Sequence, residues 1–265
     1  MPNEPSPSDP GSLITDSAAP AEPRRRAVLG GLLAVGLVSL AGAALVRRAV
    51  VTSRRRTFEE VARRAHDASQ ALAEGQITIA GWQRALDSIF QEVSPDELSE
   101  SIDLDALLAR TPDVPRGASV LTLAPDLPGG PLPGFATKLF VLRKGRANPP
   151  HAHDNMVSMH YVLRGKFRVR HYDRVRDEPD AIILKPTIDR VIGPGESTSI
   201  SENHDNVHWH LAESDGVLLD VLRAGLGDLP TETHLVDPVA ATPLEGGLLR
   251  APRLPTVDKA LERFG

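Results

Sequence analysis

The sequence predicts a mainly β fold, an antiparallel sandwich or barrel preceded by two or three helices. After Pro112 the chain has short segments rich in β-branched and large apolar residues, with Gly and Pro between them, as is typical of antiparallel strands. Between residues 57 and 110 the apolar residues instead repeat at helical spacing. The expected strands are SVLTL, FATKLFVLR, VSMHYVLRG, KFRVRHYDRV, AIILK, STSIS, NVHWHLA and GVLLDVLR.

Three stretches carry the helical pattern. From Phe58 the apolar residues follow one face as far as Gly75, where the first helix is expected to end. The stretch from Trp82 to Val93 repeats at i, i+3, i+4, i+7, i+8 and i+11, which predicts a second helix. Ser94-Pro95-Asp96-Glu97 has the pattern of an N-cap with a capping-box glutamate, and it starts a third helix that continues to Leu108. These apolar faces are interpreted as core packing.

Composition narrows the classes of function. The 265 residues suffice for one large domain or two small ones. The net charge of −5 implies no broad basic face, so no nucleic-acid partner is expected. The chain has no cysteine, which excludes disulfides and thiolate metal ligands. Any metal must therefore be held by histidine or carboxylate groups.

The N-terminus has the pattern of a targeting segment. Residues 1–26 are expected to be disordered, and the uncharged run at 27–46 is long enough for a signal or transmembrane helix. Arg25-Arg26-x-Val28-Leu29 resembles a twin-arginine export signal, and Ala41-Gly42-Ala43 is a small-x-small cleavage site. The resemblance implies the twin-arginine translocase as a partner. It also implies a protein that is membrane-associated or exported to the periplasmic side.

Arginines that follow the apolar run favour a second interpretation. They outnumber the arginines before it, and an excess of positive charge keeps a flank in the cytoplasm. In that case the uncleaved helix is a membrane anchor and the barrel is cytoplasmic. A buried soluble helix is the third alternative. The arginines concerned are Arg47, Arg48, Arg54, Arg55 and Arg56.

Two histidines in the stretch PPHAHDNM are the first candidates for a functional site. Residues i and i+2 of a strand face the same side, so His151 and His153 can both point into a barrel. Such a pair suits Fe, Ni, Mn, Cu or Zn once a third ligand faces it. Alone, the pair is also compatible with two polar residues on a solvated strand.

The spacing around this pair resembles the first cupin motif. Gly145, His151-x-His153, Ser158 and Gly165 fall at the distances of that motif, with serine where many cupins have a glutamate ligand. Downstream, Asn206-Val207-His208 follows a glycine-proline turn and resembles the second motif.

This resemblance implies a cupin barrel, also called a double-stranded β-helix or jelly roll, over residues 115–226. The helical region at 57–110 precedes it. Residues 227–265 form a C-terminal extension rich in Pro, Gly and Leu, whose last residues are expected to form a short helix.

The stretch at 151–175, HAHDNMVSMHYVLRGKFRVRHYDRV, resembles the thiol dioxygenase branch of cupins, the plant cysteine oxidases and cysteamine dioxygenase. That branch also lacks the glutamate ligand. DNVHWHLAESDGVLLDVL at 205–222 resembles its second block, and the similarity covers roughly residues 57–226. The resemblance implies Fe(II), with Mn, Ni or Zn as alternatives, on His151, His153 and His208. It further implies that O2 oxidises a cysteine, cysteamine or N-terminal-cysteine thiol to a sulfinate.

Other residues match the same family. Asp220 corresponds to an aspartate near the site, where it would take a substrate amine or orient a ligand, or be structural. Tyr172, with Asp173, matches a Tyr-Asp pair and is a catalytic or structural candidate. His210 and His160 are expected to line the cavity as acid–base or hydrogen-bonded groups, or as a fourth ligand. We expect loop or solvated positions for His66, His171, His204 and His234.

One segment departs from the family. Where the family has Pro-Pro-Tyr, this chain has Ala224-Gly225-Leu226, so the tyrosine hydroxyl is missing. Two other hypotheses therefore stand beside the thiol dioxygenase. One is a different three-histidine cupin metalloenzyme acting on a small organic substrate, and the other is a non-catalytic barrel that senses a ligand or metal.

Overall fold

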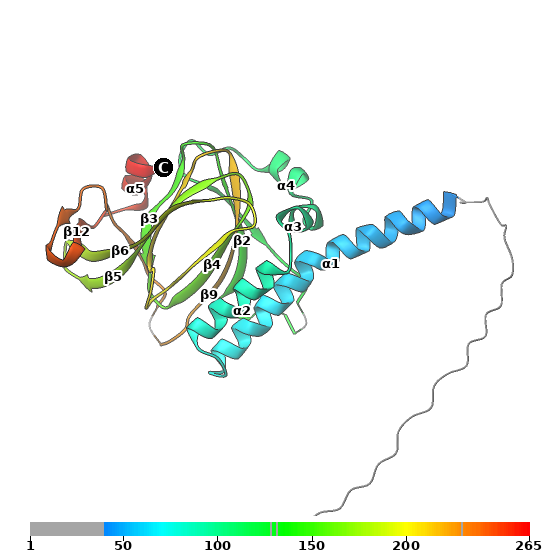
Figure 1. Cartoon of the computed structure of the whole chain (residues 1–265), viewed down its shortest axis with the longest axis horizontal. Helices are drawn as coiled ribbons and strands as arrows, with labels where there is room; N and C mark the ends of the chain where they lie inside the picture. Colours follow the sequence, from blue (N-terminus) through cyan, green and yellow to red (C-terminus); the bar gives the residue numbers. More distant parts are fainter. Residues whose placement is uncertain (1–39, 128, 131, 229) are drawn as a thin grey trace, which may run out of the picture.

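The structure is a computed structural model that describes residues 40–127, 129–130, 132–228 and 230–265, with only the backbone for 40–56. The expected disordered region, the twin-arginine pattern and most of the apolar run lie outside these residues. Among the residues described, no helix combines the length and hydropathy needed to cross a membrane. The predicted mainly β fold is confirmed (Figure 1).

The helical region packs against one side of the β structure. Helix α1 (Leu40–Ala73) begins well before the predicted start at Phe58, and it ends close to Gly75 as predicted. Helix α2 (Ile79–Gln91) confirms the second predicted helix. The predicted capping box is present at the start of α3 (Pro95–Ser101). The predicted third helix is nevertheless two helices, because Asp103 adopts a left-handed conformation with φ 51° and α4 (Leu104–Arg110) begins after it.

Two antiparallel sheets form the barrel. The five-stranded sheet has the order β1-β2-β9-β4-β7, and the seven-stranded sheet has the order β10-β3-β8-β5-β6-β12-β11. The five-stranded sheet consists of β1 (Ser119–Leu123), β2 (Phe135–Leu142), β9 (Gly216–Ala224), β4 (Met156–Arg164) and β7 (Ser197–Ser201). The other contains β10 (Thr233–Leu235), β3 (Ala147–His153), β8 (Val207–Ala212), β5 (Phe167–Asp177), β6 (Ala181–Ile192), β12 (Leu249–Pro252) and β11 (Thr242–Pro243).

The chain crosses repeatedly from one sheet to the other. It runs from β2 to β3, from β3 to β4 and from β4 to β5 across the barrel, and again from β6 to β7, β8 and β9. This alternation of antiparallel partners is the double-stranded β-helix, or jelly roll, that the sequence predicts.

Helices cover the outer face of the five-stranded sheet. Phe90 of α2 stacks on Tyr161 of β4 with ring centroids 4.5 Å apart, and the Tyr161 hydroxyl donates to the Val93 carbonyl at 2.9 Å. Trp82 and Leu86 are fully buried in the same cluster. The helical region is therefore part of the hydrophobic core.

The C-terminal extension covers the other sheet. β10 pairs with β3, and β12 pairs with β6, so this segment widens the seven-stranded sheet. Val236 and Ala251 are fully buried with Ala152 and Val207 on the outer face of that sheet. A short 3-10 turn, η1 (Glu245–Gly247), and helix α5 (Val257–Phe264) complete the chain, and α5 confirms the predicted terminal helix.

Inside the barrel, polar side chains lie between two apolar layers. We call the first layer the floor; it consists of Leu142, Val162, Phe167, Val169, Ile192, Ala212 and Leu218 with Phe140 and Ala118. We call the second the rim; it consists of Met156, Ile200 and Leu222 with Ala136 and Ala224. Residues i and i+2 of a strand share a face, so the positions between floor and rim also face the interior.

The five-stranded sheet contributes a row of polar residues between these layers. Lys138 pairs with Asp220, Asp220 with His160, and His160 with Thr198. Leu218 and Leu222, on either side of Asp220, belong to floor and rim respectively. We call this row the polar belt, and it faces the histidines of the other sheet.

Candidate metal centre

Three histidines converge inside the barrel. His151 and His153 lie on β3 and His208 lies on β8, and one ring nitrogen of each is within 4.8 Å of the others. The ring centroids are 4.1 Å apart for His151 and His208, 4.7 Å for His151 and His153, and 5.6 Å for His153 and His208. The structure therefore brings together all three residues that the sequence proposes as metal ligands.

Two prolines explain the local shape of β3. Pro149 and Pro150 have no N–H to donate, and the pairing of β3 with β8 shifts register between Asn148 and His151. Bulges of this kind redirect side chains next to functional sites. After the shift His151 pairs directly with His208.

Each ligand histidine has a partner for its Nδ1. His151 Nδ1 lies 2.7 Å from the Pro149 carbonyl, and His208 Nδ1 lies 3.2 Å from the Asn206 carbonyl. A carbonyl only accepts, so these nitrogens carry the proton and leave the Nε2 lone pairs for a metal. His153 Nδ1 lies 3.1 Å from the Thr233 hydroxyl, which can accept in the same way.

Two further residues support the ligands, and one of them, Thr233, was not expected from the sequence. Thr233 belongs to β10 of the C-terminal extension and reaches His153 because β10 pairs with β3. The Asn206 side chain donates to the His153 carbonyl at 2.7 Å and to the Ser201 carbonyl at 3.0 Å, tying β8 to β3. The Asn-x-His pattern marks Asn206 in the sequence, whereas nothing local marks Thr233.

The three ligands are neutral at physiological pH. Burial lowers the pKa of His151 to about 4, with a smaller lowering from His160. Burial, and then the neighbouring charges of His151, His160 and Lys138, lower the pKa of His153. The pKa of His208 also lies well below its usual value, mainly because of burial. Neutral imidazoles are the form that binds metal.

No carboxylate takes part in the ligand set. Ser158, at the position of the cupin glutamate, instead donates a short hydrogen bond to Asp220. Asp220 is 4 % exposed, and its Oδ1 lies 3.8 Å from His160 Nε2. Burial raises the pKa of Asp220, opposed by His160 and the Ser158 hydrogen bond. Asp220 therefore lies in the polar belt opposite the three histidines.

Further histidines extend the site towards the floor. His160 lies 5.3 Å from His208 and 4.5 Å from His210, measured between ring centroids. His210 is fully buried, as expected for a cavity-lining residue, and its two ring nitrogens make no hydrogen bond among the described residues. It is an acid–base candidate by position, close to the three ligands and out of contact with solvent.

Three of the remaining histidine assignments were wrong. His171 is fully buried, pairs with His208 across β5 and β8 and faces the interior. His66 is 7 % exposed and its ring meets Phe135 edge-on at 5.5 Å. His234 forms an ion pair with Asp154 at 2.6 Å and is largely buried. These three side chains are buried by contacts with segments that are distant in the sequence. The polarity of the neighbouring residues in the sequence does not indicate such contacts. The exposed position expected for His204 is confirmed.

Tyr172 is not brought to the metal centre. It packs with Ala152 and Val207 in the cluster under the C-terminal extension, on the face of β5 opposite His171. This corrects the catalytic assignment, because adjacent residues of a strand point to opposite faces. Its neighbour Asp173 accepts from the Asp205 N–H at 2.9 Å, which is a structural role.

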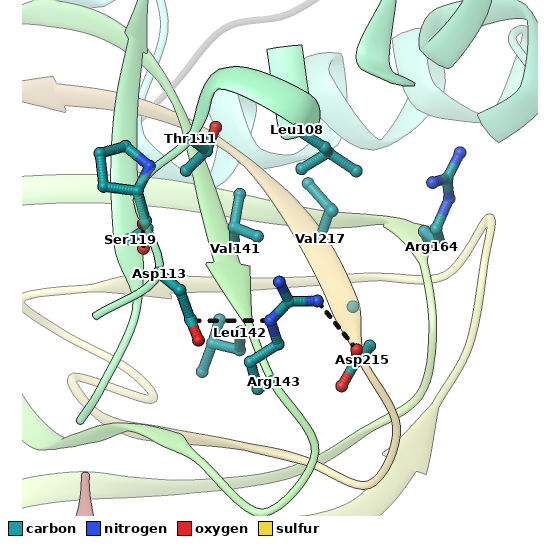
Figure 2. A pocket seen from close by; sticks show the side chains of 12 residues that line it. Leu108, Thr111, Asp113, Ser119, Val141, Leu142, Arg143, Arg164, Asp215 and Val217 are labelled. Atoms are coloured by element: carbon teal, nitrogen blue, oxygen red, sulfur yellow. Dashed lines mark hydrogen bonds and ion pairs between the residues drawn. The ribbon is translucent and has the colours of Figure 1, made fainter. Parts of the chain in front are cut away.

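A surface hollow borders one of the three candidate ligands, His153. This hollow of about 300 Å³ is lined by His153 and Asn206 together with Arg174 and Arg176. A second hollow, shown in Figure 2, lies elsewhere, beside Leu108 and Val217. There Arg143 bridges Asp113 and Asp215, and no histidine is among the lining residues. Of these two hollows, the one lined by His153 and Asn206 adjoins the candidate metal ligands.

The donor set fits a first-row divalent metal. Three neutral imidazoles with fixed Nδ1 partners could hold such an ion and would leave other coordination positions free for further ligands. Imidazole suits Fe, Zn, Cu and Ni, so the geometry admits a metal without selecting one.

Comparisons with known proteins give likenesses to solved structures at low sequence identity. No protein-family model and no curated protein matches the chain. Among solved structures, KdgF from Halomonas sp. is 20 % identical over 43 % of this chain and 84 % of that one, with a TM-score of 0.32. An RmlC-like cupin from Shewanella frigidimarina is 19 % identical over 44 % and 86 %, with a TM-score of 0.32.

A recombinant oxalate oxidase in complex with glycolate is 19 % identical over 44 % of this chain and 57 % of that chain, with a TM-score of 0.33. Such likenesses concern the double-stranded β-helix and assign no activity to this chain.

Replacing Thr233 tests the support of His153. Thr233→Val removes the acceptor for Nδ1–H, so the ring loses its fixed tautomer and orientation. We expect the dissociation constant for a divalent metal to rise about ten-fold, measured by competition with a chromophoric chelator. The matched control is Thr242→Val on exposed β11. Equal affinities of the two variants would show that Thr233 does not support the site.

His171 makes the stability of the metal-free protein depend on pH. Burial, with the neighbouring charges, lowers its pKa to about 3, whereas in the unfolded chain its pKa is near 6.5. Below pH 6.5 the unfolded chain binds a proton that the folded chain does not, so stability falls as the pH falls. His171→Asn should reduce the loss of unfolding free energy between pH 7.5 and 5.5 by about 1.4 kcal/mol.

Urea unfolding in the presence of a chelator measures this difference. An unchanged pH dependence in both His171→Asn and His171→Leu would contradict the burial of a neutral His171.

Proposed function

We propose that the chain is a non-haem iron dioxygenase that oxidises a small thiol to a sulfinate. The observation that carries the proposal is a ligand set of three neutral histidines without a carboxylate. Ser158 occupies the position where many cupins have a glutamate ligand, and its hydroxyl donates to Asp220. The reaction is R–SH + O2 → R–SO2H, and both oxygen atoms of O2 go to sulfur.

Charge favours a thiol as substrate. Three neutral imidazoles leave the full 2+ charge of the ion uncompensated, and a coordinating thiol is readily deprotonated under these conditions. His151, His153 and His208 would hold Fe(II), which would supply the Lewis acidity and the redox chemistry for the reaction of a thiol with O2. The chain's own part is to hold the three nitrogens in place and to keep the surroundings of the ion largely free of water.

Residues of the polar belt would position the substrate. Asp220 faces the three histidines from the opposite sheet and would accept hydrogen bonds from a substrate amine. His160 and His210 lie between the ligands and the floor, and are placed to exchange a proton with a bound group.

The absence of a tyrosine favours a second candidate function. The chain has two tyrosines: Tyr161 packs among the helices and Tyr172 lies under the C-terminal extension. Leu226, where the thiol dioxygenases have tyrosine, packs against the helical cluster. No phenol hydroxyl is therefore available in the barrel. A different three-histidine metalloenzyme, which acts on another small organic substrate, would not need a phenol hydroxyl in the barrel.

Oxygen consumption separates these functions. We expect iron-loaded protein to consume O2 when given cysteine, cysteamine or a peptide with N-terminal cysteine, and mass spectrometry to show a product heavier by two oxygen atoms. His208→Ala should abolish both signals, because it removes one of the three ligands.

The matched control is Thr242→Val, because Thr242 is exposed on β11 and is distant in the sequence from the three histidines. Oxygen uptake that stays at the rate without substrate for every thiol would reject the thiol dioxygenase. Metal content of protein purified without added metal then distinguishes another metalloenzyme from a metal-free binding module.

We also propose that the protein is membrane-associated or exported through the twin-arginine route, on the support of the N-terminal pattern at residues 25–29. A fluorescent protein fused after Gly265 should appear in the periplasmic or membrane fraction. Replacing Arg25-Arg26 by two lysines should retain it in the cytoplasm. A fusion that is cytoplasmic with either sequence would contradict export, and one that is membrane-bound with either would favour the anchor.

A further inference from the structure

Lys138 lies at the centre of β2 and faces the barrel interior. Its neighbours at i−2 and i+2, Ala136 and Phe140, pack in the rim and the floor. Its neighbours at i−1 and i+1, Thr137 and Leu139, are buried on the opposite face. The lysine is itself partly buried. Its side chain therefore belongs to the polar belt, between the two apolar layers.

The ammonium group of Lys138 has no partner among the described residues. Asp220 is the residue paired with Lys138 on the neighbouring strand β9, but the two side chains form no ion pair. The Asp220 carboxylate instead accepts a hydrogen bond from Ser158 and lies beside His160. By contrast, the cationic Arg174 at the hollow is neutralised by Asp154 and Asp177. A cation that faces the barrel interior without a counterion is available to pair with an anion that binds there.

Lys138 lies within electrostatic reach of the metal centre. Its charge contributes to the lowered pKa of His153, after burial and the charges of His151 and His160. It also acts on Asp220, whose pKa burial raises and the charge of Lys138 lowers. A small molecule bound at the three histidines would therefore meet a cation and a carboxylate on the opposite sheet, in adjacent positions.

We propose that Lys138 binds a carboxylate of the substrate, so that the preferred substrate is a small thiol carrying a carboxylate. This inference rests on the proposed function, since it places the thiol sulfur at the three-histidine metal. An amino acid thiol would engage both groups, its carboxylate at Lys138 and its amine at Asp220. A peptide with N-terminal cysteine has no carboxylate next to the amine and would leave Lys138 unpaired.

Thiol binding to Co(II)-loaded protein tests the proposal without turnover. The probes are 3-mercaptopropionate, which is anionic, cysteamine, which is cationic, and 2-mercaptoethanol, which is neutral. Coordination of sulfur is followed by the thiolate-to-cobalt absorption band. Lys138→Met should weaken binding of 3-mercaptopropionate at least ten-fold and leave 2-mercaptoethanol unchanged, while Lys138→Arg should stay within about three-fold of the unaltered protein.

The matched control is Lys144→Met, an exposed lysine outside the barrel interior, which should change none of the three affinities. Thermal unfolding and cobalt content show whether each variant is folded and loaded. Weakening of all three thiols alike by Lys138→Met, or of none, would overturn the proposal, as would the absence of any thiolate band in the unaltered protein.

Oxygen consumption separates failure of this inference from failure of the proposed function. Charge-dependent thiol binding without oxygen uptake would retain Lys138 as an anion-binding residue and reject the dioxygenase. Oxygen uptake with an unchanged KM for 3-mercaptopropionate in Lys138→Met would retain the dioxygenase and reject Lys138 as an anion-binding residue.

Discussion

The pairing of β3 with β8 is the constraint on which the interior of this barrel depends. It places His151 directly opposite His208, and it is reached through a register shift at Pro149 and Pro150. The prolines cannot donate to the ladder, and the carbonyl of Pro149 accepts from His151 Nδ1. The residues that interrupt the strand therefore also orient the ligand. A register slip of one residue would turn His151 and His153 out of the barrel.

The second feature is a polar interior held between apolar layers. Floor and rim supply the hydrophobic contacts, while the positions between them hold imidazoles, a carboxylate and an ammonium group. Several of these groups, including both ring nitrogens of His171 and His210, make no hydrogen bond among the described residues. Buried polar groups without partners destabilise a fold. Their concentration at one depth is typical of a site kept for binding at the expense of stability.

Much of the fold was predictable from local patterns. Short segments rich in β-branched and large apolar residues located most strands, and the capping box located α3. The spacing of His151, His153 and His208 located the candidate metal centre. What escaped prediction depends on contacts between distant segments.

Thr233 reaches His153 through the pairing of β10 with β3. Lys138 becomes a candidate binding residue because it pairs with Asp220, which is far away in the sequence. His171 and Tyr172 are adjacent, and only the packing of the finished barrel tells which of them points inward. The break between α3 and α4 comes from the left-handed conformation of Asp103. The apolar spacing around Asp103 continues at helical intervals and does not predict this break.

The C-terminal extension has a consequence for how the molecule can be divided. A fragment ending at Leu226 would keep all three imidazoles, yet it would uncover Ala152 and Val207 and delete the hydroxyl that holds His153. The C-terminal extension is therefore part of the outer wall of the barrel that holds the three histidines. The smallest autonomous unit of this protein is accordingly larger than the barrel that its sequence motifs outline.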